Sequence, residues 1–148
     1  MRSVADSIRQ FGDRYLGRVF TADERDYCAG IGSRGGDSVP HFAARFAAKE
    51  AVMKVLRPSA SDGVAWSSIE ILRDADGGCT VRLRGAAREL ARRARLGSFA
   101  VSMSHERDYA TAVALAERAQ SAPRPQRARD DGRRKRPRAG TTKRVQAQ

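Results

Sequence analysis

A carboxylate and two lysines stand among small and apolar residues in the stretch RFAAKEAVMKVL, residues 45–56. In a helix each residue advances about 100° around the axis. Four apolar side chains then share one narrow stripe: Phe42, Phe46, Met53 and Leu56. Lys49 falls in the middle of that stripe, and Glu50 and Lys54 flank it one turn apart, beside small alanine side chains. Charged groups therefore stand where the core contact of this helix is expected.

Two interpretations fit this pattern. In the first, Glu50 and Lys54 form an exposed ion pair worth about a few tenths of a kcal/mol. The methylenes of Lys49 then cross the apolar stripe while its ammonium reaches water. In the second, the helix carries a phosphate and metal site, where the carboxylate anchors a hard cation such as Mg²⁺ and the lysines neutralise phosphate oxygens. Helical periodicity is compatible with both.

The elements that would position this stretch begin with helices. Apolar residues at helical spacing predict an amphipathic helix over residues 4–16. The capping-box pattern Thr21-Ala-Asp-Glu24 predicts a second, short helix that ends near residue 28. Four glycines within residues 30–38 interrupt regular structure. The Ser-Val-Pro sequence at 38–40 is expected to cap and open the long helix that contains the charged stretch.

The second half of the chain is expected to form hairpins around one further helix. The predicted elements are a strand at 68–73, a turn at 74–78, a strand at 79–84, a helix from Gly85 to Gly97, a strand at 99–104 and, after a polar turn, a strand at 109–117. Trp66 and Tyr109 are expected to lie in the core. Together these elements predict an α+β domain in which helices pack on a small, mainly antiparallel sheet.

The net charge of +12 is concentrated at the C-terminal end. Residues 119–148 contain ten Lys and Arg and two Asp, and they have almost no apolar side chains. Such a composition cannot bury enough surface to offset ordering, so we expect a folded domain over 1–118 and a disordered basic tail over 119–148. The tail would attract polyanions in a salt-dependent way. It has no aromatic residue to stack on bases, so any nucleic-acid binding would be non-specific. A solubilising appendage is the other interpretation.

The cysteines, the hydropathy and the N-terminal stretch indicate the cellular compartment of the protein. Cys28 and Cys79 lack a CxxC spacing or a nearby histidine pair, which favours two free thiols over a disulfide or a metal site. No apolar run approaches the roughly 20 residues that a membrane helix needs. The N-terminal stretch contains acidic residues and does not resemble a secretory signal. We therefore expect a cytoplasmic protein without a membrane partner.

Three stretches resemble one family in both order and spacing. HFAARFAAKEAVMKVL, WSSIEILRDADG and FAVSMSHERDYATAVAL are similar to the holo-acyl-carrier-protein synthases, the small phosphopantetheinyl transferases. The resemblance covers about residues 3–117. It implies a phosphopantetheinyl transferase-like fold and a Mg²⁺-dependent reaction. The family moves the 4′-phosphopantetheine arm of coenzyme A onto a serine of apo acyl carrier protein and releases adenosine 3′,5′-bisphosphate.

The resemblance also assigns roles to individual residues. Glu50 would be the Mg²⁺ ligand in the helix, and Lys54 would contact the diphosphate and assist the incoming serine. Arg45 and His105 would hold the nucleotide phosphates. Without the resemblance, His105 is equally well explained as a residue that hydrogen-bonds the turn after its strand. Negative charge that gathers on the leaving group suits a bound cation and fixed ammonium groups.

Partners follow from the same resemblance. Carrier proteins are acidic, and Arg14 and Arg18 match the arginines with which the family docks them; a solvated charged face is the alternative. Complementary charge would mainly speed encounter. The family also implies a homotrimer with coenzyme A sites between subunits, which would bring Glu50 and Lys54 of one chain near Arg45 or His105 of another.

The sequence departs from the family at its start. Relatives open with a strand resembling GIGLDIV, whose aspartate is a second Mg²⁺ ligand, whereas Met1 here falls where the first helix begins. Asp6 lies within that helix and is no substitute. Either the strand is encoded upstream of Met1, or the protein is a catalytically impaired paralogue. The glycine-rich loop that often follows the motif helix is also replaced, by residues 57–63.

Overall fold

The computed structural model describes residues 3–106 and 109–118 of the 148-residue chain. The helices are α1 (Val4–Val19), α2 (Ala22–Gly32), α3 (Val39–Leu56) and α4 (Gly85–Arg93). The strands are β1 (Ile69–Arg73), β2 (Cys79–Leu83), β3 (Leu96–His105) and β4 (Ala110–Arg118). Two short 3₁₀ helices, Ala60–Asp62 and Trp66–Ser68, connect α3 to β1. The predicted basic tail lies outside the described residues.

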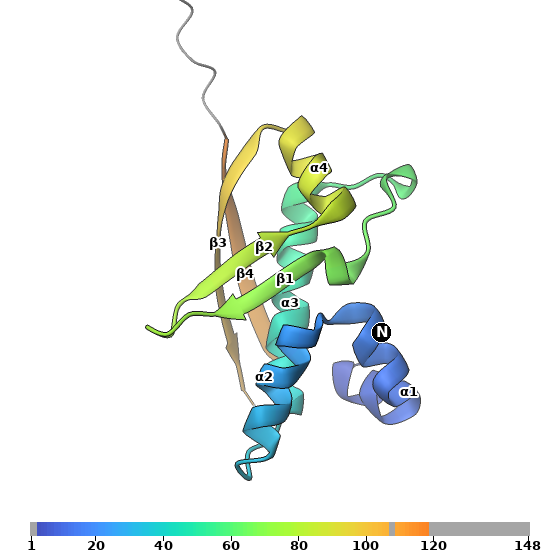
Figure 1. The fold of residues 1–148 in the computed structure, drawn as a ribbon, viewed down its shortest axis with the longest axis vertical. Helices are drawn as coiled ribbons and strands as arrows, with labels where there is room; N and C mark the ends of the chain where they lie inside the picture. The colour runs from blue at the N-terminus through green and yellow to red at the C-terminus, as the bar shows by residue number, and fades with distance from the viewer. Residues whose placement is uncertain (1–2, 107–108, 119–148) are drawn as a thin grey trace, which may run out of the picture.

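The described strands form one antiparallel sheet in the order β1-β2-β3-β4. The hairpin of β1 and β2 is paired from Ile69 opposite Leu83 to Arg73 opposite Cys79. α3 runs along one face of the sheet, with α1 and α2 towards one of its ends and α4 towards the other (Figure 1). The predicted α+β architecture is thus confirmed.

Local sequence explains where the first two helices begin. The Ser3 hydroxyl accepts a hydrogen bond from the Asp6 amide at 3.1 Å and caps α1. The predicted capping box is present, because the Thr21 hydroxyl accepts from the Glu24 amide and the Glu24 carboxylate accepts from the Thr21 amide. α2 continues to Gly32, past the end that was predicted near residue 28.

Three further local features differ from the prediction. Ser38 makes no side-chain cap at α3; the Asp37 carboxylate instead accepts a hydrogen bond from the Val39 amide at 2.9 Å. α4 ends at Arg93, because Arg95 adopts a left-handed conformation with φ 56° that turns the chain into β3. α1 is broken at Gly12, whose φ of 50° and ψ of −133° are open to glycine but strained for other residues.

The main core forms where α3 meets the sheet and α4. Its buried side chains are Ala48, Val52, Leu56, Ile69, Ile71, Ala87, Leu90 and Ala91. α3 is buried over more of its circumference than one stripe, since it contacts both the sheet and α1. Helical periodicity identifies one apolar face and does not show a second neighbour, which is why the predicted stripe omitted Ala48 and Val52.

Two negative findings accompany this fold within the described ranges. Cys28 and Cys79 are both free thiols, as predicted. No helix among residues 3–106 and 109–118 has the length and apolar character needed to cross a bilayer.

Candidate active site

Glu50 lies in a cleft of about 510 Å³ beside the N-terminal half of α3. Its side chain is half-buried, and the small residues Ala43 and Ala47 leave space next to it. Asp37 and Glu106 bring two more carboxylates to the same cleft. A cleft is therefore present beside Glu50, and the alanines that neighbour Glu50 in the helix border it.

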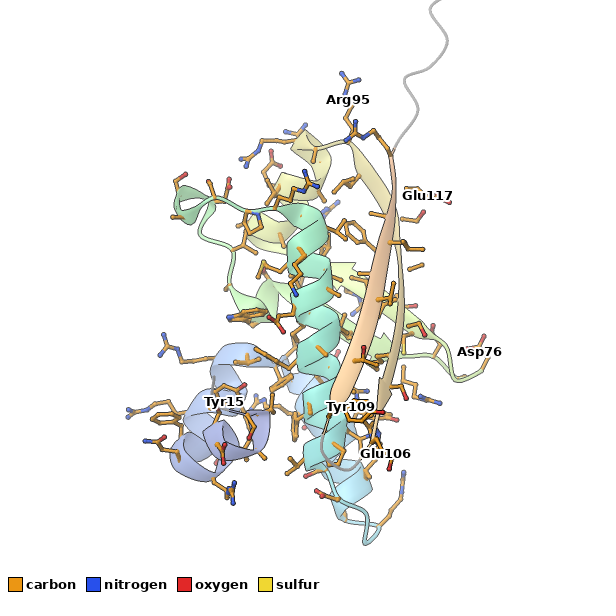
Figure 2. All side chains as sticks on the ribbon, turned by 180° about the vertical axis from the view of Figure 1, so that it is seen from behind. Tyr15, Asp76, Arg95, Glu106, Tyr109 and Glu117 are labelled. Atoms are coloured by element: carbon orange, nitrogen blue, oxygen red, sulfur yellow. The ribbon has the colours of Figure 1, made fainter. Side chains whose placement is uncertain are left out.

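Tyr109 also lines this cleft and corrects a prediction. It was expected in the core, but it is 68% exposed. Figure 2 shows Tyr109 and Glu106 at the same end of the sheet, beside the start of α3. The aromatic ring stands at the start of β4, before the alternating small residues that pack on α3, so the strand pattern gave no reason to separate it from the core. Its position makes it a wall of the cleft.

Arg45 and His105 meet in a second hollow, a pocket of about 370 Å³. Arg45 is only 2% exposed, and its guanidinium lies 4.2 Å from the centre of the Tyr27 ring. Arg45 Nη1 donates to the His41 carbonyl at 3.3 Å, whereas its Nε has no hydrogen-bond acceptor among the described residues. Tyr27 and His41 both line the pocket, and neither was singled out from the sequence.

The pocket is electropositive. His41 and His105 contact each other edge-to-face, with ring centroids 4.7 Å apart. The pKa of His41 is lowered, first by its partial burial and then by the nearby His105, Arg45 and Arg73, while Asp37 acts in the opposite direction. None of the residues that line the pocket carries a carboxylate, and Ser102 and Ser104 add hydroxyl donors. The pocket therefore suits an anion such as a phosphate.

Lys54 is not part of either hollow. Its side chain is exposed on the last turns of α3. The expected ion pair with Glu50 is absent from the six ion pairs of the described residues. Within one chain the structure thus joins Arg45 with His105 and places Glu50 in a different hollow.

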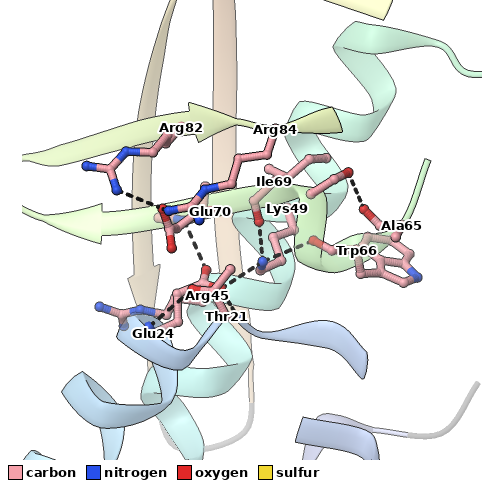
Figure 3. A network of polar contacts seen from close by, with 12 residues as sticks. Thr21, Glu24, Arg45, Lys49, Ala65, Trp66, Ile69, Glu70, Arg82 and Arg84 are labelled. Carbon is pink, nitrogen blue, oxygen red and sulfur yellow. Dashed lines mark hydrogen bonds and ion pairs between the residues drawn. The ribbon is translucent and has the colours of Figure 1, made fainter. Parts of the chain in front are cut away.

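Lys49 has neither of the two roles considered for it. Its side chain is 0% exposed, so its ammonium does not reach water and cannot neutralise a substrate phosphate. Instead its Nζ lies 2.9 Å from Glu24 Oε2 and donates to backbone carbonyls of Trp66 and Ile69 (Figure 3). The pKa of Lys49 is lowered by burial, against the raising effect of Glu24. The sequence placed Lys49 in the apolar stripe, but both interpretations left its ammonium accessible, and nothing in the sequence identified its buried partner.

A second buried carboxylate, Glu70, lies beside this pair. It accepts hydrogen bonds from Arg82 at 3.1 Å and from Arg84 at 2.9 Å. Burial alone would raise the pKa of Glu70, but the Thr21 hydroxyl and the two arginines more than compensate, so the pKa is lowered. The folded state therefore prefers the ionised form of Glu70.

The lowered pKa of Glu70 predicts how the stability of the protein depends on pH. A lowered pKa in the folded state stabilises the protein above the unfolded pKa of a glutamate, about 4.3, and the stabilisation is lost as the pH falls through the folded value. Glu70→Gln is expected to lower the free energy of unfolding relative to the wild type. This difference should be constant from pH 7 to 5 and should become smaller below pH 5. Urea unfolding at each pH measures it, with Glu117→Gln, an exposed carboxylate, as control. An equal loss at pH 3 and pH 7 would contradict the assignment.

Arg14 and Arg18 project beside a groove of about 560 Å³ between α1 and the Trp66–Ser68 turn. Both arginines are exposed. The other lining residues are mainly apolar: Phe11, Tyr15, Val19, Ala65 and Trp66. Trp66 is half-buried and packs on Phe46 with ring centroids 5.1 Å apart, so it belongs both to the core, as predicted, and to this groove.

Comparison with known proteins places this geometry in a family. A family model described as the 4′-phosphopantetheinyl transferase superfamily matches residues 1–114. The holo-[acyl-carrier-protein] synthase of Koribacter versatilis is 40% identical over 119 residues, which cover 77% of this chain and 88% of the relative.

Solved structures agree. The crystal structure of holo-[acyl-carrier-protein] synthase from Neisseria meningitidis superposes with a TM-score of 0.66 at 28% identity, covering 77% of this chain and 88% of that one. An acyl carrier protein synthase–coenzyme A complex from Chronobacterium ammoniagenes gives a TM-score of 0.66 at 31% identity, covering 79% and 90%. Since the family model, the sequence relatives and the solved folds coincide, this chain belongs to the 4′-phosphopantetheinyl transferase superfamily.

Proposed function

We propose that the protein is a holo-[acyl-carrier-protein] synthase of the cytoplasm. It transfers 4′-phosphopantetheine from coenzyme A to a serine of apo acyl carrier protein. The serine oxygen forms a new bond to the phosphorus that carries pantetheine, the P–O bond of the diphosphate breaks, and adenosine 3′,5′-bisphosphate leaves. The serine proton passes to a base. The observation that carries this proposal is the pairing, along α3, of a carboxylate cleft at Glu50 with a cationic pocket at Arg45.

Arg45 and His105 would bind the nucleotide phosphates. The guanidinium of Arg45 is held in place by the Tyr27 ring and the His41 carbonyl, so it meets a phosphate without reorganising. The coenzyme A complex of the related Chronobacterium protein supports coenzyme A as the substrate.

Glu50 would hold Mg²⁺. No group of three or more His, Cys, Asp and Glu within residues 3–106 and 109–118 is arranged to enclose a metal ion. Mg²⁺, however, commonly binds through one or two carboxylates together with water and substrate phosphates. A half-buried carboxylate at an open cleft fits that requirement. When bound, the ion would neutralise charge on the diphosphate.

In a homotrimer, Glu50 and Lys54 of one chain would lie near Arg45 or His105 of another, and Lys54 would contact the diphosphate there. The support is that Glu50 and the Arg45 pocket are separate in one chain, and that the outer face of β4 is apolar. Val113 and Leu115 on that face are 62% and 67% exposed. Light scattering at several protein concentrations tests the assembly, and a monomer at all of them would contradict it.

Mass spectrometry tests the reaction itself. The protein is incubated with coenzyme A, Mg²⁺ and an apo acyl carrier protein, and the carrier is expected to gain about 340 Da, the mass of one arm attached to a side chain. A carrier protein with a serine-to-alanine change at the attachment site is the control. An unmodified wild-type carrier would contradict the proposed activity.

Arg14 and Arg18 would dock the acidic carrier protein. We expect the double change of both arginines to glutamate to raise the KM for carrier protein and to leave the KM for coenzyme A unchanged, because neither residue lines the cationic pocket. Added salt should slow the wild type more than the variant, since steering by surface charge is screened. Steady-state kinetics with each substrate varied measures this, with Arg88→Glu, a change at an exposed residue of α4, as control. Unchanged carrier-protein kinetics would place docking elsewhere.

A further inference from the structure

Glu24 and Lys49 form an ion pair that is sealed from solvent. Both side chains are 0% exposed, and Nζ lies 2.9 Å from Oε2. Besides Glu24, the ammonium donates to the backbone carbonyls of Trp66 at 3.1 Å and of Ile69. Its three donors thus have three acceptors, all of them protein oxygens.

Glu24 is equally well satisfied. Its carboxylate accepts hydrogen bonds from the Thr21 amide at the start of α2 and from the Ile71 amide in β1, each at 2.9 Å. The pair therefore joins α2, α3 and the segment that enters β1, as Figure 3 shows. The polar atoms of this junction fix both the distance between these elements and their rotation.

A gain in stability alone does not explain why this buried contact is an ion pair rather than an apolar contact. Removing two ions from water is costly, and a well-packed apolar pair of similar volume often stabilises a fold as well or better. An apolar contact, however, permits small sliding and rotation, whereas directed hydrogen bonds from a buried ammonium do not. The pair thus fixes the position and rotation of α3 relative to α2 and β1 more closely than an apolar contact would.

Two candidate site residues lie close to Lys49 on α3, and their placement depends on the rotation of this helix. Glu50, which faces the carboxylate cleft, is the next residue, and Arg45, which faces the cationic pocket, is one turn earlier on α3. Tyr27, whose ring carries the Arg45 guanidinium, lies one turn after Glu24 on α2. Rotation of α3 against α2 would therefore displace both Glu50 and Arg45.

We propose that Glu24 and Lys49 are positioning residues for the transfer reaction, which hold α3 so that Glu50 and Arg45 face their hollows. This inference rests on the proposed function. It concerns residues that contact no substrate. Their contribution is to the placement of two groups that do, and a misplacement near 1 Å can cost about a hundredfold in rate.

The decisive variant is the double change Glu24→Leu with Lys49→Met, which replaces the pair by apolar side chains. We expect its urea-unfolding midpoint to fall, because the backbone groups that the pair satisfies at Thr21, Ile71, Trp66 and Ile69 lose their partners. We also expect kcat of the folded variant to fall about tenfold to a hundredfold. The affinity for adenosine 3′,5′-bisphosphate, measured by calorimetry, should fall as well, because Arg45 is displaced. A folded double variant with wild-type kcat and wild-type nucleotide affinity would overturn the proposal.

Two further variants complete the test. Glu70→Gln, in the neighbouring buried network, is the matched control and should lose stability but keep kcat. If the double variant does not fold, Glu24→Gln, which keeps the size of the side chain, decides by the same criteria. If the wild-type protein forms no holo carrier protein, the proposed function is contradicted. The positioning role is then tested by nucleotide binding alone: the double variant should still bind adenosine 3′,5′-bisphosphate more weakly than the wild type.

Discussion

Glu50→Gln is expected to lower kcat for phosphopantetheine transfer by about 10²- to 10³-fold, because several kcal/mol of charge stabilisation at the diphosphate depend on the cation that this carboxylate would hold. Glutamine keeps the size of the side chain in the half-buried cleft and removes only its charge. The fold should be unaffected, since Glu50 forms none of the ion pairs of the described residues. The KM for carrier protein should remain unchanged.

Turnover is measured by mass spectrometry of the carrier protein across a Mg²⁺ titration. The control is Glu89→Gln, an exposed carboxylate of α4 that lines neither hollow. The loss of kcat should be smallest at high Mg²⁺ if the variant still binds the ion weakly. A variant with wild-type turnover at all Mg²⁺ concentrations would remove Glu50 from the reaction.

Arg45→Met should raise the KM for coenzyme A by about 10- to 100-fold and leave the KM for carrier protein unchanged. The expected size corresponds to the loss of a hydrogen bond to a charged group, about 1.5–3 kcal/mol. Methionine keeps an apolar side chain beside Tyr27 and removes the cation together with its hydrogen bond to the His41 carbonyl. Arg45→Lys should lie between the two, because an ammonium keeps the charge but cannot reproduce the planar stacking on the ring.

Calorimetry with coenzyme A and steady-state kinetics measure this effect, and Arg88→Met, an exposed arginine of α4, is the control. Since Arg45 is buried, each variant is first compared with the wild type by urea unfolding. A folded Arg45→Met protein with unchanged coenzyme A affinity would show that the pocket does not bind the nucleotide.

The sequence predicted those elements whose signals are local. The capping box at Thr21 and the hairpin around residues 74–78 are set by short patterns, and both are present. The end of α4 was missed because the turn depends on the left-handed conformation of Arg95, a residue type that seldom adopts it. Such a conformation at an arginine has no signature in composition.

The site was only partly predictable for a similar reason. Helical spacing separated Glu50 from the apolar stripe and placed small alanines beside it, whereas the cleft itself appears only in the structure. The partnership of Lys49 with Glu24 joins residues 25 positions apart, and a glutamate at the third position of a helix ordinarily indicates a cap at the surface. That the same carboxylate serves as cap, ion-pair partner and strand acceptor became visible only with the three elements in place.

The position of β4 in the sheet has a consequence for handling the protein. β4 is an end strand of the sheet formed by residues 3–106 and 109–118, and its outer face carries the exposed Val113 and Leu115. A long, apolar end strand is a template for the addition of further strands and hence for aggregation. Monomeric protein, in which β4 is uncovered, is therefore expected to precipitate more readily than protein in which another chain packs on β4.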